Sequence, residues 1–301
     1  MKILCTGAAG FIGSNVVDLL LKGGHQVWCI DNLSTGKREN LPKKIEFAKV
    51  DVGNWFDLVS EFVDCEPEAV IHLAAQPSLD ESFDNPIRDG YVNVMGTLNV
   101  LRASQKIGVK RIVFASTSAV YAGDHSMPIP EYWDTIPNSP YGISKLAAES
   151  YLRTLMPDTS VVLRFGNVYG GRQVPIGENQ VIPKMILHFE KGEKFYIHGD
   201  GEQMRDYIHV DDVACACLDA LESPPGVFNI GYGAGVTVNT LASLLAKIYN
   251  VPDYKWEHDD KKDTRGNIEL DISKARKIMN WEPNVTLYDG LQKTVAWWKA
   301  Q

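Results

Sequence analysis

Short apolar runs alternate with amphipathic helical patterns through the first half of the chain. Six runs have the length and the β-branched and aromatic content of buried strands: residues 2–7, 26–31, 45–51, 69–75, 111–117 and 160–166. Each leads into helix-compatible sequence or into a loop, as in residues 93–108, where apolar side chains recur about every 3.6 positions. This alternation is typical of β-α-β units and predicts an α/β fold with a Rossmann-type, doubly wound parallel sheet.

After about Gly166 the pattern breaks into loops that contain glycine and proline. A helix is predicted near residues 181–192, a short return to the sheet near 205–222, an apolar run at 226–231 and a helical end. We therefore expect a Rossmann domain over residues 1–165, with a return segment near 205–230. A smaller, discontinuous α/β lobe over residues 166–204 and 231–301 would bind the substrate.

Composition and charge exclude several classes of function. Thirty basic against 38 acidic residues give a net charge of -8, and no lysine or arginine run offsets it, so we expect no nucleic-acid partner. The N-terminal segment lacks the apolar region of a signal peptide and no apolar run of 18 residues follows, so we expect a cytoplasmic protein without a membrane partner. The five cysteines are scattered through apolar segments, which predicts buried thiols and no metal site: Cys5, Cys29, Cys65, Cys215 and Cys217.

The segment TGAAGFIGS joins the first predicted strand to the first predicted helix. Gly7, Gly10 and Gly13 permit a tight turn, a close approach of the backbone to a pyrophosphate and close packing of the helix on the strand. Asp31 ends the second predicted strand, where a carboxylate accepts hydrogen bonds from both hydroxyls of an adenosine ribose and repels a 2′-phosphate. The pattern predicts a site for NAD in preference to NADP.

Tyr141 and Lys145 stand four residues apart at the start of a predicted helix. They would lie on one face of it, either as a catalytic base with its cation or as an ordinary surface pair. A free tyrosine has a pKa near about 10, and lowering that pKa by about three units takes about 4 kcal/mol. One cation at about 4 Å supplies that much in an effective dielectric of about 20. If the pair is catalytic, we expect Lys145 to lower the pKa of Tyr141.

Several ordered motifs resemble the extended short-chain dehydrogenase/reductase family. They are the glycine loop, Asp31, DV at 51–52, HLAAQ at 72–76, Asn93, ASTSAVY at 115–121 and the Tyr141 and Lys145 pair. Downstream, LRFGNVYG at 163–170, HGDGEQMRDYIHVDDVA at 198–214 and LDISKARKIMNWEP at 270–283 are similar to the nucleotide-sugar epimerase/dehydratase branch of that family. The resemblance extends over essentially the whole chain and implies a Rossmann-type fold with tightly bound NAD.

The resemblance also implies site residues. For NAD these are, besides the glycine loop and Asp31, the residues Phe11, Ile12, Asn32, Ser34, Thr35, Gly36, Asp51, Val52, Leu73, Ala74, Ala75, Asn93, Phe165, Tyr141 and Lys145. For a nucleotide-sugar they are Thr117, Asn167, Gln180, Val181, Arg205 and Arg265. Arg205 corresponds to a diphosphate-binding arginine. Gln180 stands where a related epimerase has asparagine, and Arg265 lies in a segment that departs from the family's Arg-Pro-Gly-Asp.

The family completes its catalytic group with a serine or threonine after the fifth strand, which is Thr117 here. In its dehydratases and decarboxylases, acidic residues follow that position, whereas this chain has Ser118 and Ala119, which disfavours elimination. The resemblance therefore implies a nucleotide-sugar 4-epimerase in which Thr117, Tyr141 and Lys145 are catalytic. Such an enzyme would interconvert UDP-glucose and UDP-galactose, or their N-acetyl forms, by transient oxidation at sugar carbon 4.

Two alternatives stay open at this stage. One is another nucleotide-sugar oxidoreductase, either a 4-ketoreductase or a dehydratase, and the other is a dinucleotide-binding regulator without catalysis. The sequence leaves the sugar undetermined, and we expect residues 195–198 and 267–269 to select it. Ala122 is a further departure, because the family has glycine there. By resemblance we also expect a homodimer formed through a helix pair that flanks the sheet.

Overall fold

The computed structural model describes residues 1–121, 126–175, 180–251, 256–260 and 266–301. Its largest element is a seven-stranded sheet in the order β10-β6-β5-β4-β1-β2-β3, with all neighbours parallel. The strands are β1 (Lys2–Thr6), β2 (Gln26–Ile30), β3 (Glu46–Ala48), β4 (Ala69–His72), β5 (Arg111–Thr117), β6 (Ser160–Phe165) and β10 (Gly226–Ile230). All six predicted strands are present, and the predicted Rossmann-type α/β class is confirmed.

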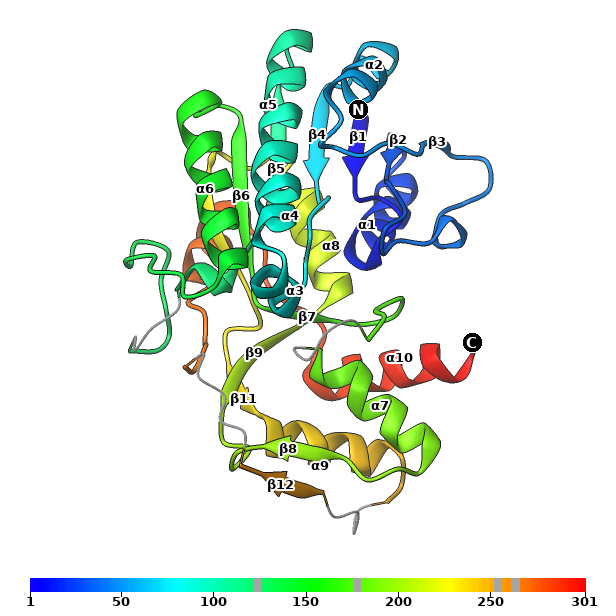
Figure 1. Ribbon diagram of the computed structural model, residues 1–301, viewed down its shortest axis with the longest axis vertical. Coiled ribbons are helices and arrows are strands. Elements are labelled where there is room, and N and C mark those ends of the chain that lie inside the picture. The colour runs from blue at the N-terminus through cyan, green and yellow to red at the C-terminus, as the bar shows by residue number, and fades with distance from the viewer. Residues whose placement is uncertain (122–125, 176–179, 252–255, 261–265) are drawn as a thin grey trace.

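Helices cover both faces of this sheet. One face packs against α1 (Phe11–Lys22), α8 (Val210–Asp219) and η4 (Ala275–Met279). The other packs against α2 (Trp55–Cys65), α5 (Gly96–Ile107) and α6 (Pro140–Leu155). Figure 1 shows α5 in front of the sheet and α8 behind it. Because both faces are covered, the strands are apolar almost throughout, which is why they read as continuous runs.

Short elements connect the strands at the edges of the sheet. They are η1 (Arg38–Asn40), α3 (Leu79–Asp84), α4 (Pro86–Gly90), η2 (Tyr91–Met95) and η3 (Ser118–Tyr121). Asn85 caps α4 by accepting a hydrogen bond from the Arg88 amide, and Pro86 occupies the first helical turn, where its missing N–H costs nothing. The chain then runs through η2 directly into α5, so residues 86–107 form one continuous helical segment.

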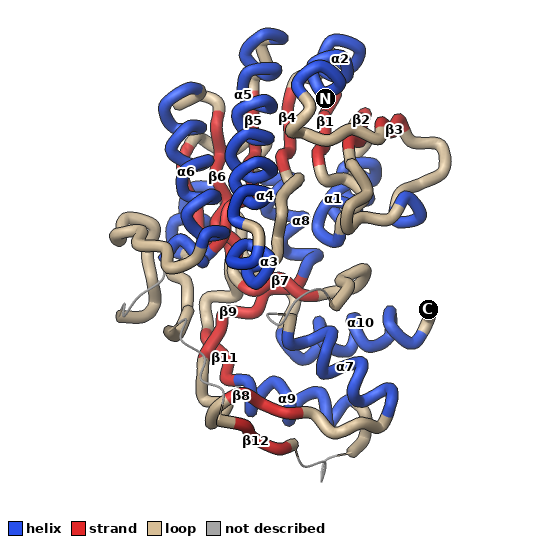
Figure 2. The backbone as a smooth tube through the Cα atoms, in the orientation of Figure 1, coloured by secondary structure: helices blue, strands red, loops and turns tan. Residues whose placement is uncertain are grey.

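A smaller lobe lies beyond the carboxyl edge of the large sheet (Figures 1 and 2). It contains a three-stranded sheet in the order β11-β9-β7 and a two-stranded sheet of β12 and β8. Its elements are β7 (Asn167–Tyr169), α7 (Val181–Lys191), β8 (Tyr196–His198), β9 (Met204–His209), β11 (Gly235–Thr237), α9 (Val238–Ile248), β12 (Glu257–Asp259) and α10 (Leu287–Lys299). Buried residues such as Ile186, Leu241 and Leu291 join its three helices in a separate core.

One expectation about the large sheet needs correction. The return to it was expected to begin near residue 205, but β9 pairs with β7 and β11 in the smaller sheet. The return is made by α8, which packs on α1, and by β10, which pairs with β6. The pattern of β9 identifies a strand correctly, but its partners lie far away in the sequence and leave no trace in that pattern.

The cysteines are unpaired and mostly buried, as the sequence predicts. All five thiols are unpaired, four are buried and Cys215 is half-buried. Burial raises the pKa of Cys29 to about 12 and that of Cys65 to about 11.

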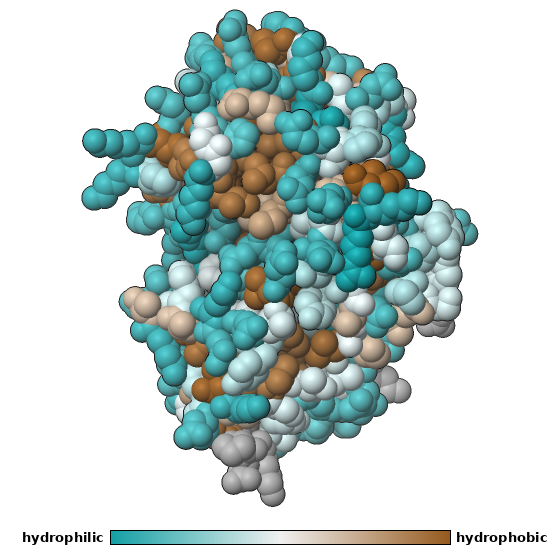
Figure 3. All heavy atoms as spheres, turned by 180° about the vertical axis from the view of Figure 1, so that it is seen from behind, coloured by the Kyte–Doolittle hydropathy of each residue, from teal (hydrophilic) through white to brown (hydrophobic). Residues whose placement is uncertain are grey.

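Seen from behind, hydrophobic residues gather in the upper half of the molecule, among hydrophilic ones (Figure 3). Across the described ranges, no helix combines the length and the apolar character needed to cross a membrane.

Candidate active site

The carboxyl ends of the parallel strands meet at the edge that faces the smaller lobe (Figure 1). Two cavities open there, of about 330 Å³ and about 270 Å³. We call them the first and the second cavity. Five residues line both of them: Phe11, Ile12, Pro77, Gln173 and Gln180. The two cavities therefore adjoin, and a ligand in one can touch a ligand in the other.

The glycine loop forms one wall of the first cavity. Gly7 has φ 67°, and a Cβ there would lie 2.6 Å from the amide nitrogen of Ala74. A Cβ on Gly13 would lie 2.0 Å from the carbonyl oxygen of Gly7, so α1 packs directly on the loop. Phe11, Ile12 and Gly13 bring the N-terminus of α1 to the cavity. The backbone thus forms a cradle that a side chain would fill, at a helix end that favours a phosphate.

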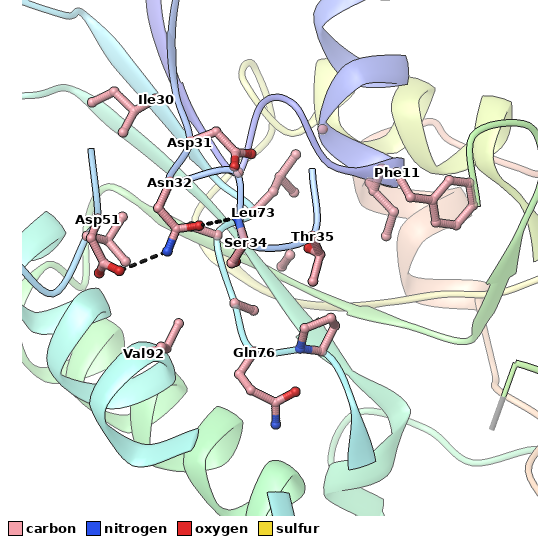
Figure 4. Close-up of a pocket in the computed structure, with 18 of the residues that line it drawn as sticks. Phe11, Ile30, Asp31, Asn32, Ser34, Thr35, Asp51, Leu73, Gln76 and Val92 are labelled. Atoms are coloured by element: carbon pink, nitrogen blue, oxygen red, sulfur yellow. Dashed lines mark hydrogen bonds between the residues drawn. The ribbon is translucent and has the colours of Figure 1, made fainter. Parts of the chain in front are cut away.

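Asp31 lies beside this loop, at the end of β2 (Figure 4). Its Oδ2 accepts a hydrogen bond of 2.9 Å from the Ala9 amide, and its Oδ1 accepts one of 2.7 Å from the Leu33 amide. Burial raises the pKa of this carboxyl, while bonds from the Leu33, Ala9 and Gly10 amides lower it. The carboxylate is held in one orientation at the cavity wall and fits the hydroxyls of an adenosine ribose.

A second carboxylate supports the loop after β2. Asn32 donates from Nδ2 to Oδ2 of Asp51 over 2.8 Å and accepts from the Ser34 amide over 2.9 Å (Figure 4). The Gly53 amide donates to the other oxygen of Asp51 over 2.8 Å. The loops after β2 and β3 are therefore tied together along the first cavity.

Thirteen of the residues predicted to bind NAD line the first cavity: Gly7, Phe11, Ile12, Gly13, Asp31, Asn32, Ser34, Thr35, Asp51, Val52, Leu73, Ala74 and Ala75. Four others stand behind its wall. Gly10 precedes α1, and a Cβ on Gly36 would lie 2.8 Å from the carbonyl carbon of Ala9. Asn93 is buried beneath Gln76, and Phe165 belongs to the sheet core. These four do not line the first cavity.

Sequence reasoning missed one side of the first cavity. That side consists of Gln76, Pro77, Glu81, Arg88, Tyr91 and Val92, together with Gln173 and Val174. Gln76 ends the quoted HLAAQ motif, so the motif itself pointed to it. The others lie on short helices and on a loop after β7, and no sequence signal brings them to the cavity.

Thr117 and Tyr141 lie together in the wall of the second cavity. Thr117 ends β5, and Tyr141 lies in the first turn of α6, which Ser139 caps by accepting a 3.1 Å hydrogen bond from the Gly142 amide. A hydrogen-bonding interaction with Thr117 lowers the pKa of Tyr141. The Thr117 hydroxyl also accepts from the Ala119 amide over 3.1 Å. The predicted proton-transfer pair is thus assembled by the fold.

Lys145 lies one turn along α6 and is buried. Its Nζ is 4.3 Å from the centre of the Phe114 ring. Burial lowers the pKa of Lys145 to about 8, while the charges of Glu149 and Asp89 raise it. The lysine does not line either cavity among the described lining residues, so it acts on them from behind the wall.

The expectation of a lowered tyrosine pKa is not met in the protein alone. Burial raises the pKa of Tyr141 to about 12, the bond from Thr117 opposes this, and the charge of Asp89 adds to it. The spacing of residues 141 and 145 reflects the charge of Lys145 but not the loss of water around the phenol. Nor does that spacing show Asp89, which comes from α4 and whose charge raises the pKa of Tyr141 further.

A buried polar network links this region to the first cavity. The Nδ1 of His72 lies 2.7 Å from the Thr6 hydroxyl and its Nε2 lies 3.0 Å from the Thr97 hydroxyl. Asn93 accepts from the Gln76 amide over 2.8 Å and donates to Asp89 over 3.0 Å. Burial lowers the pKa of His72 to about 3, so this histidine is a neutral structural link.

Other predicted substrate residues also lie at the second cavity, which is lined by Asn167, Gln180 and Arg205, and by the unpredicted Asp80 and Asn138. Arg205 is buried in β9 and donates from Nη1 to the carbonyls of Met204 and Gly266, each over 2.7 Å. Val181 begins α7 and lines neither cavity. Arg265 and Ala122 lie outside the described residues.

The expected specificity segments separate in the structure. Residue 268 lines the second cavity, whereas none of residues 195–198 appears among the described lining residues. Tyr196–His198 forms β8, which pairs with β12 at the far side of the smaller lobe. The strand was expected near the sugar because of its place in the sequence, but it lies at the end of the smaller lobe that is away from the large sheet (Figure 1).

The fold and the two adjoining cavities define a class: an enzyme that binds a dinucleotide at a Rossmann sheet beside a Thr-Tyr pair. The family model of the NAD dependent epimerase/dehydratase family matches residues 3–231, and the chain belongs to this family. The glycine cradle and the Asp31 carboxylate fit NAD, and the predicted cofactor is confirmed.

Relatives of known activity cover the whole chain. UDP-glucose 4-epimerase of Mycolicibacterium smegmatis is 37% identical over 311 residues, 99% of each chain. The crystal structure of UDP-glucose 4-epimerase with UDP-glucose from Thermotoga maritima has a TM-score of 0.96 and 41% identity, covering 100% of this chain and 99% of that one. The Thermus thermophilus UDP-glucose 4-epimerase complex with NAD has a TM-score of 0.92 and 36% identity, covering 99% of each.

Proposed function

We propose that this protein is an NAD-dependent UDP-sugar 4-epimerase that interconverts UDP-glucose and UDP-galactose, or their N-acetyl forms. One observation carries the proposal: Thr117 and Tyr141 line one cavity, this cavity adjoins the cofactor cavity, and the two residues that follow Thr117 are Ser118 and Ala119. These two cannot act as the acid and base of an elimination. The activities of the relatives named above support the same choice.

The residues perform proton transfer as follows. Thr117 holds the oxygen on sugar carbon 4, and Tyr141 takes the proton of that hydroxyl. When bound, NAD would supply the hydride acceptor, and its positive ring would add to the field of Lys145 and favour the ionised tyrosine. The 4-keto sugar would then turn within the second cavity to present its other face, and Tyr141 would return the proton to the oxygen on carbon 4.

The charge of the second cavity favours a neutral sugar. Asp80 lines it, half-buried, at the start of α3. Arg205, the one described lysine or arginine that lines this cavity, is assigned to the diphosphate, together with Asn167 and Gln180. A carboxylate on the sugar would face the Asp80 carboxylate, and the described lining residues supply no second lysine or arginine to bind it. We therefore place neutral hexoses ahead of uronic acids as substrates.

The proposal assigns cofactor and substrate binding to different parts of the chain, and the protein to a cellular compartment. The large sheet, with α8 and β10 as its return segment, binds NAD, and the smaller lobe, which includes β9 and Arg205, binds the nucleotide part of the nucleotide-sugar. The core of the smaller lobe, built from α7, α9 and α10, supports this division. Unpaired cysteines suit a reducing compartment, and we assign the protein to the cytoplasm.

The proposed assembly is a homodimer through neighbouring helices. Apolar side chains are exposed at four-residue intervals from α3 to η2, namely Phe83, Ile87, Tyr91 and Met95, and α6 exposes Ile143, Tyr151 and Leu155. The two helical segments are packed against each other. We call these seven residues the helical apolar surface. An exposed apolar area of this kind favours association with a second copy.

A mass and label experiment tests the activity. UDP-, dTDP-, CDP- and GDP-sugars deuterated at carbon 4 are incubated with the protein without added cofactor. We expect a UDP-hexose to give its 4-epimer at constant mass with the deuterium kept, because hydride goes to the bound cofactor and back without meeting solvent. Loss of water or carbon dioxide, release of stoichiometric NADH or wash-out of deuterium would each reject the 4-epimerase and favour the dehydratase or ketoreductase.

A further inference from the structure

Gln173 carries a buried acceptor without a partner. It lies on the loop after β7 and is 8% exposed. Its Nε2 donates to the carbonyl oxygen of Val168 over 3.2 Å, which fixes the amide orientation, because the flipped amide would set two oxygens against each other. Its Oε1 has no hydrogen-bond partner in the described parts of the chain. Buried carbonyl oxygens are rarely left in this state, so the atom is suited to a ligand that donates an N–H or O–H.

The loop that carries Gln173 is held in place. Asn15 donates to the carbonyl of Gly171 over 3.4 Å, and Arg172 donates to Asp18 over 2.7 Å, so two contacts tie the loop to α1. Arg172 has φ 70°, in the left-handed region that is unfavourable for a residue with a Cβ. A strained residue fixed by an ion pair indicates that the position of the loop matters.

Gln173 stands where the two cavities adjoin, because it lines both of them. With the adenosine ribose at Asp31, the dinucleotide extends along the first cavity toward that boundary. The sugar carbon lies near Thr117 and Tyr141 in the second cavity, and hydride must pass directly between the two ligands. The nicotinamide ring must therefore lie at the boundary. Its carboxamide is the one group on that ring with N–H donors.

We propose that Oε1 of Gln173 accepts a hydrogen bond from the carboxamide N–H of nicotinamide and so fixes which face of the ring meets the sugar. Gln173 is then a cofactor-positioning residue. The inference rests on NAD binding and extends it to a residue outside the glycine loop. It differs from the binding of the adenosine half, because the groups at Asp31 do not distinguish one nicotinamide substituent from another.

A competition between two dinucleotides tests this. The protein is equilibrated with NAD and its 3-acetylpyridine analogue, which keeps the carbonyl but lacks the N–H donors, until the ratio of bound nucleotides is constant. Mass analysis of the nucleotide released on denaturation gives that ratio. We expect Gln173→Leu to reduce the preference for NAD over the analogue by about fivefold to tenfold, the effect of one hydrogen bond. Gln173→Met should do the same and serves if the leucine variant does not fold.

Gln105→Leu is the matched control. Gln105 also donates its amide to a backbone carbonyl, that of Leu155 over 3.0 Å, but it lines neither cavity. It should keep the parent's ratio. A parental ratio in both Gln173 variants would overturn the proposal, and weaker UDP-glucose binding with an unchanged ratio would assign the atom to a sugar hydroxyl instead. A parent that retains neither dinucleotide would contradict the NAD assignment itself.

Discussion

At the scale of single residues, the site is defined by ionisable groups that burial moves away from their working states. Burial raises the pKa of Tyr141 to about 12 and lowers that of Lys145 to about 8. Proton abstraction needs the opposite pattern, an ionised tyrosine beside a charged lysine. The protein alone therefore holds the phenol protonated, and bound ligands must contribute the field that ionises it. This coupling ties chemistry to cofactor binding.

The tyrosine can be tested by removing only its hydroxyl. Tyr141→Phe should lower turnover by about 10² to 10⁴, the usual effect of losing a general acid or base, while UDP-sugar binding survives because the ring remains. Steady-state kinetics and calorimetric titration measure the two effects. Tyr151→Phe is the control, since Tyr151 lies on the same helix but is exposed. Near-normal turnover in Tyr141→Phe would contradict the proposed base.

Lys145 gives a prediction for stability against pH. Its folded-state pKa of about 8 lies below its ordinary value of 10.5, so between these values the unfolded chain binds more protons than the folded one. In that window stability rises with pH. The unfolding free energy of the parent, minus that of Lys145→Met, should increase by about 2 to 4 kcal/mol from pH 7 to pH 10.5. Urea denaturation at several pH values measures it, and parallel curves would show that the lysine is not perturbed.

At the scale of elements, the junction of β1 and α1 depends on close contact. A Cβ on Gly13 would lie 2.0 Å from the Gly7 carbonyl oxygen, so the helix can reach the loop only without a side chain there. The same contact sets the N-terminus of α1 against the first cavity. The position of α1 and the binding of a phosphate at its N-terminus therefore depend on the same contact between Gly13 and Gly7.

Gly13→Ala should disrupt this junction. We expect a loss of about 1 to 3 kcal/mol in unfolding free energy from the overlap, with reduced retention of NAD because α1 must move away from the loop. Gly90→Ala is the control: Gly90 has helical φ -62°, and nothing lies within 4 Å of the added Cβ. That variant should be as stable as the parent, or slightly more so. Thermal denaturation and released-nucleotide analysis give both readouts, and equal behaviour of the two variants would contradict the argument.

The elements also show what sequence could predict. The strands were readable because burial on both faces gives continuous apolar runs, and the glycine loop because its spacing reflects backbone contact. The sequence did not predict that Asp80 and Gln173 line a cavity, or that the charge of Asp89 acts on Tyr141. They reach the site only because short helices after β4 and a loop after β7 fold over the sheet edge. The prediction of a lowered pKa for Tyr141 was wrong for the same reason, since the spacing of residues 141 and 145 shows neither the burial of Tyr141 nor the charge of Asp89.

At the scale of the whole molecule, the large sheet and the smaller lobe meet at the candidate site. The large sheet forms most of the first cavity, and the smaller lobe adds Asn167, Gln180 and Arg205 to the second. Both cavities open at the carboxyl edge of the sheet, and of the helical apolar surface only Tyr91 is among the described lining residues. The helical apolar surface lies on α3, α4, η2 and α6. Dimerisation should therefore stabilise the fold without completing the chemistry.

That separation gives the last prediction. Ile143→Glu combined with Leu155→Glu places two charges on the exposed side of α6, where the parent residues are 55% and 41% exposed. Burial of these charges against a second copy is unfavourable, so the variant should be monomeric, at 33.5 kDa, where the parent has twice that mass. Ile278→Glu, on η4 at the opposite face of the sheet, should stay dimeric. Sedimentation equilibrium measures the masses. The monomer should keep NAD and epimerise at a rate within a fewfold of the parent, because Ile143 and Leu155 line neither cavity. A dimeric double variant would place the interface elsewhere, and a folded monomer that lost its NAD would show that the two chains share the site.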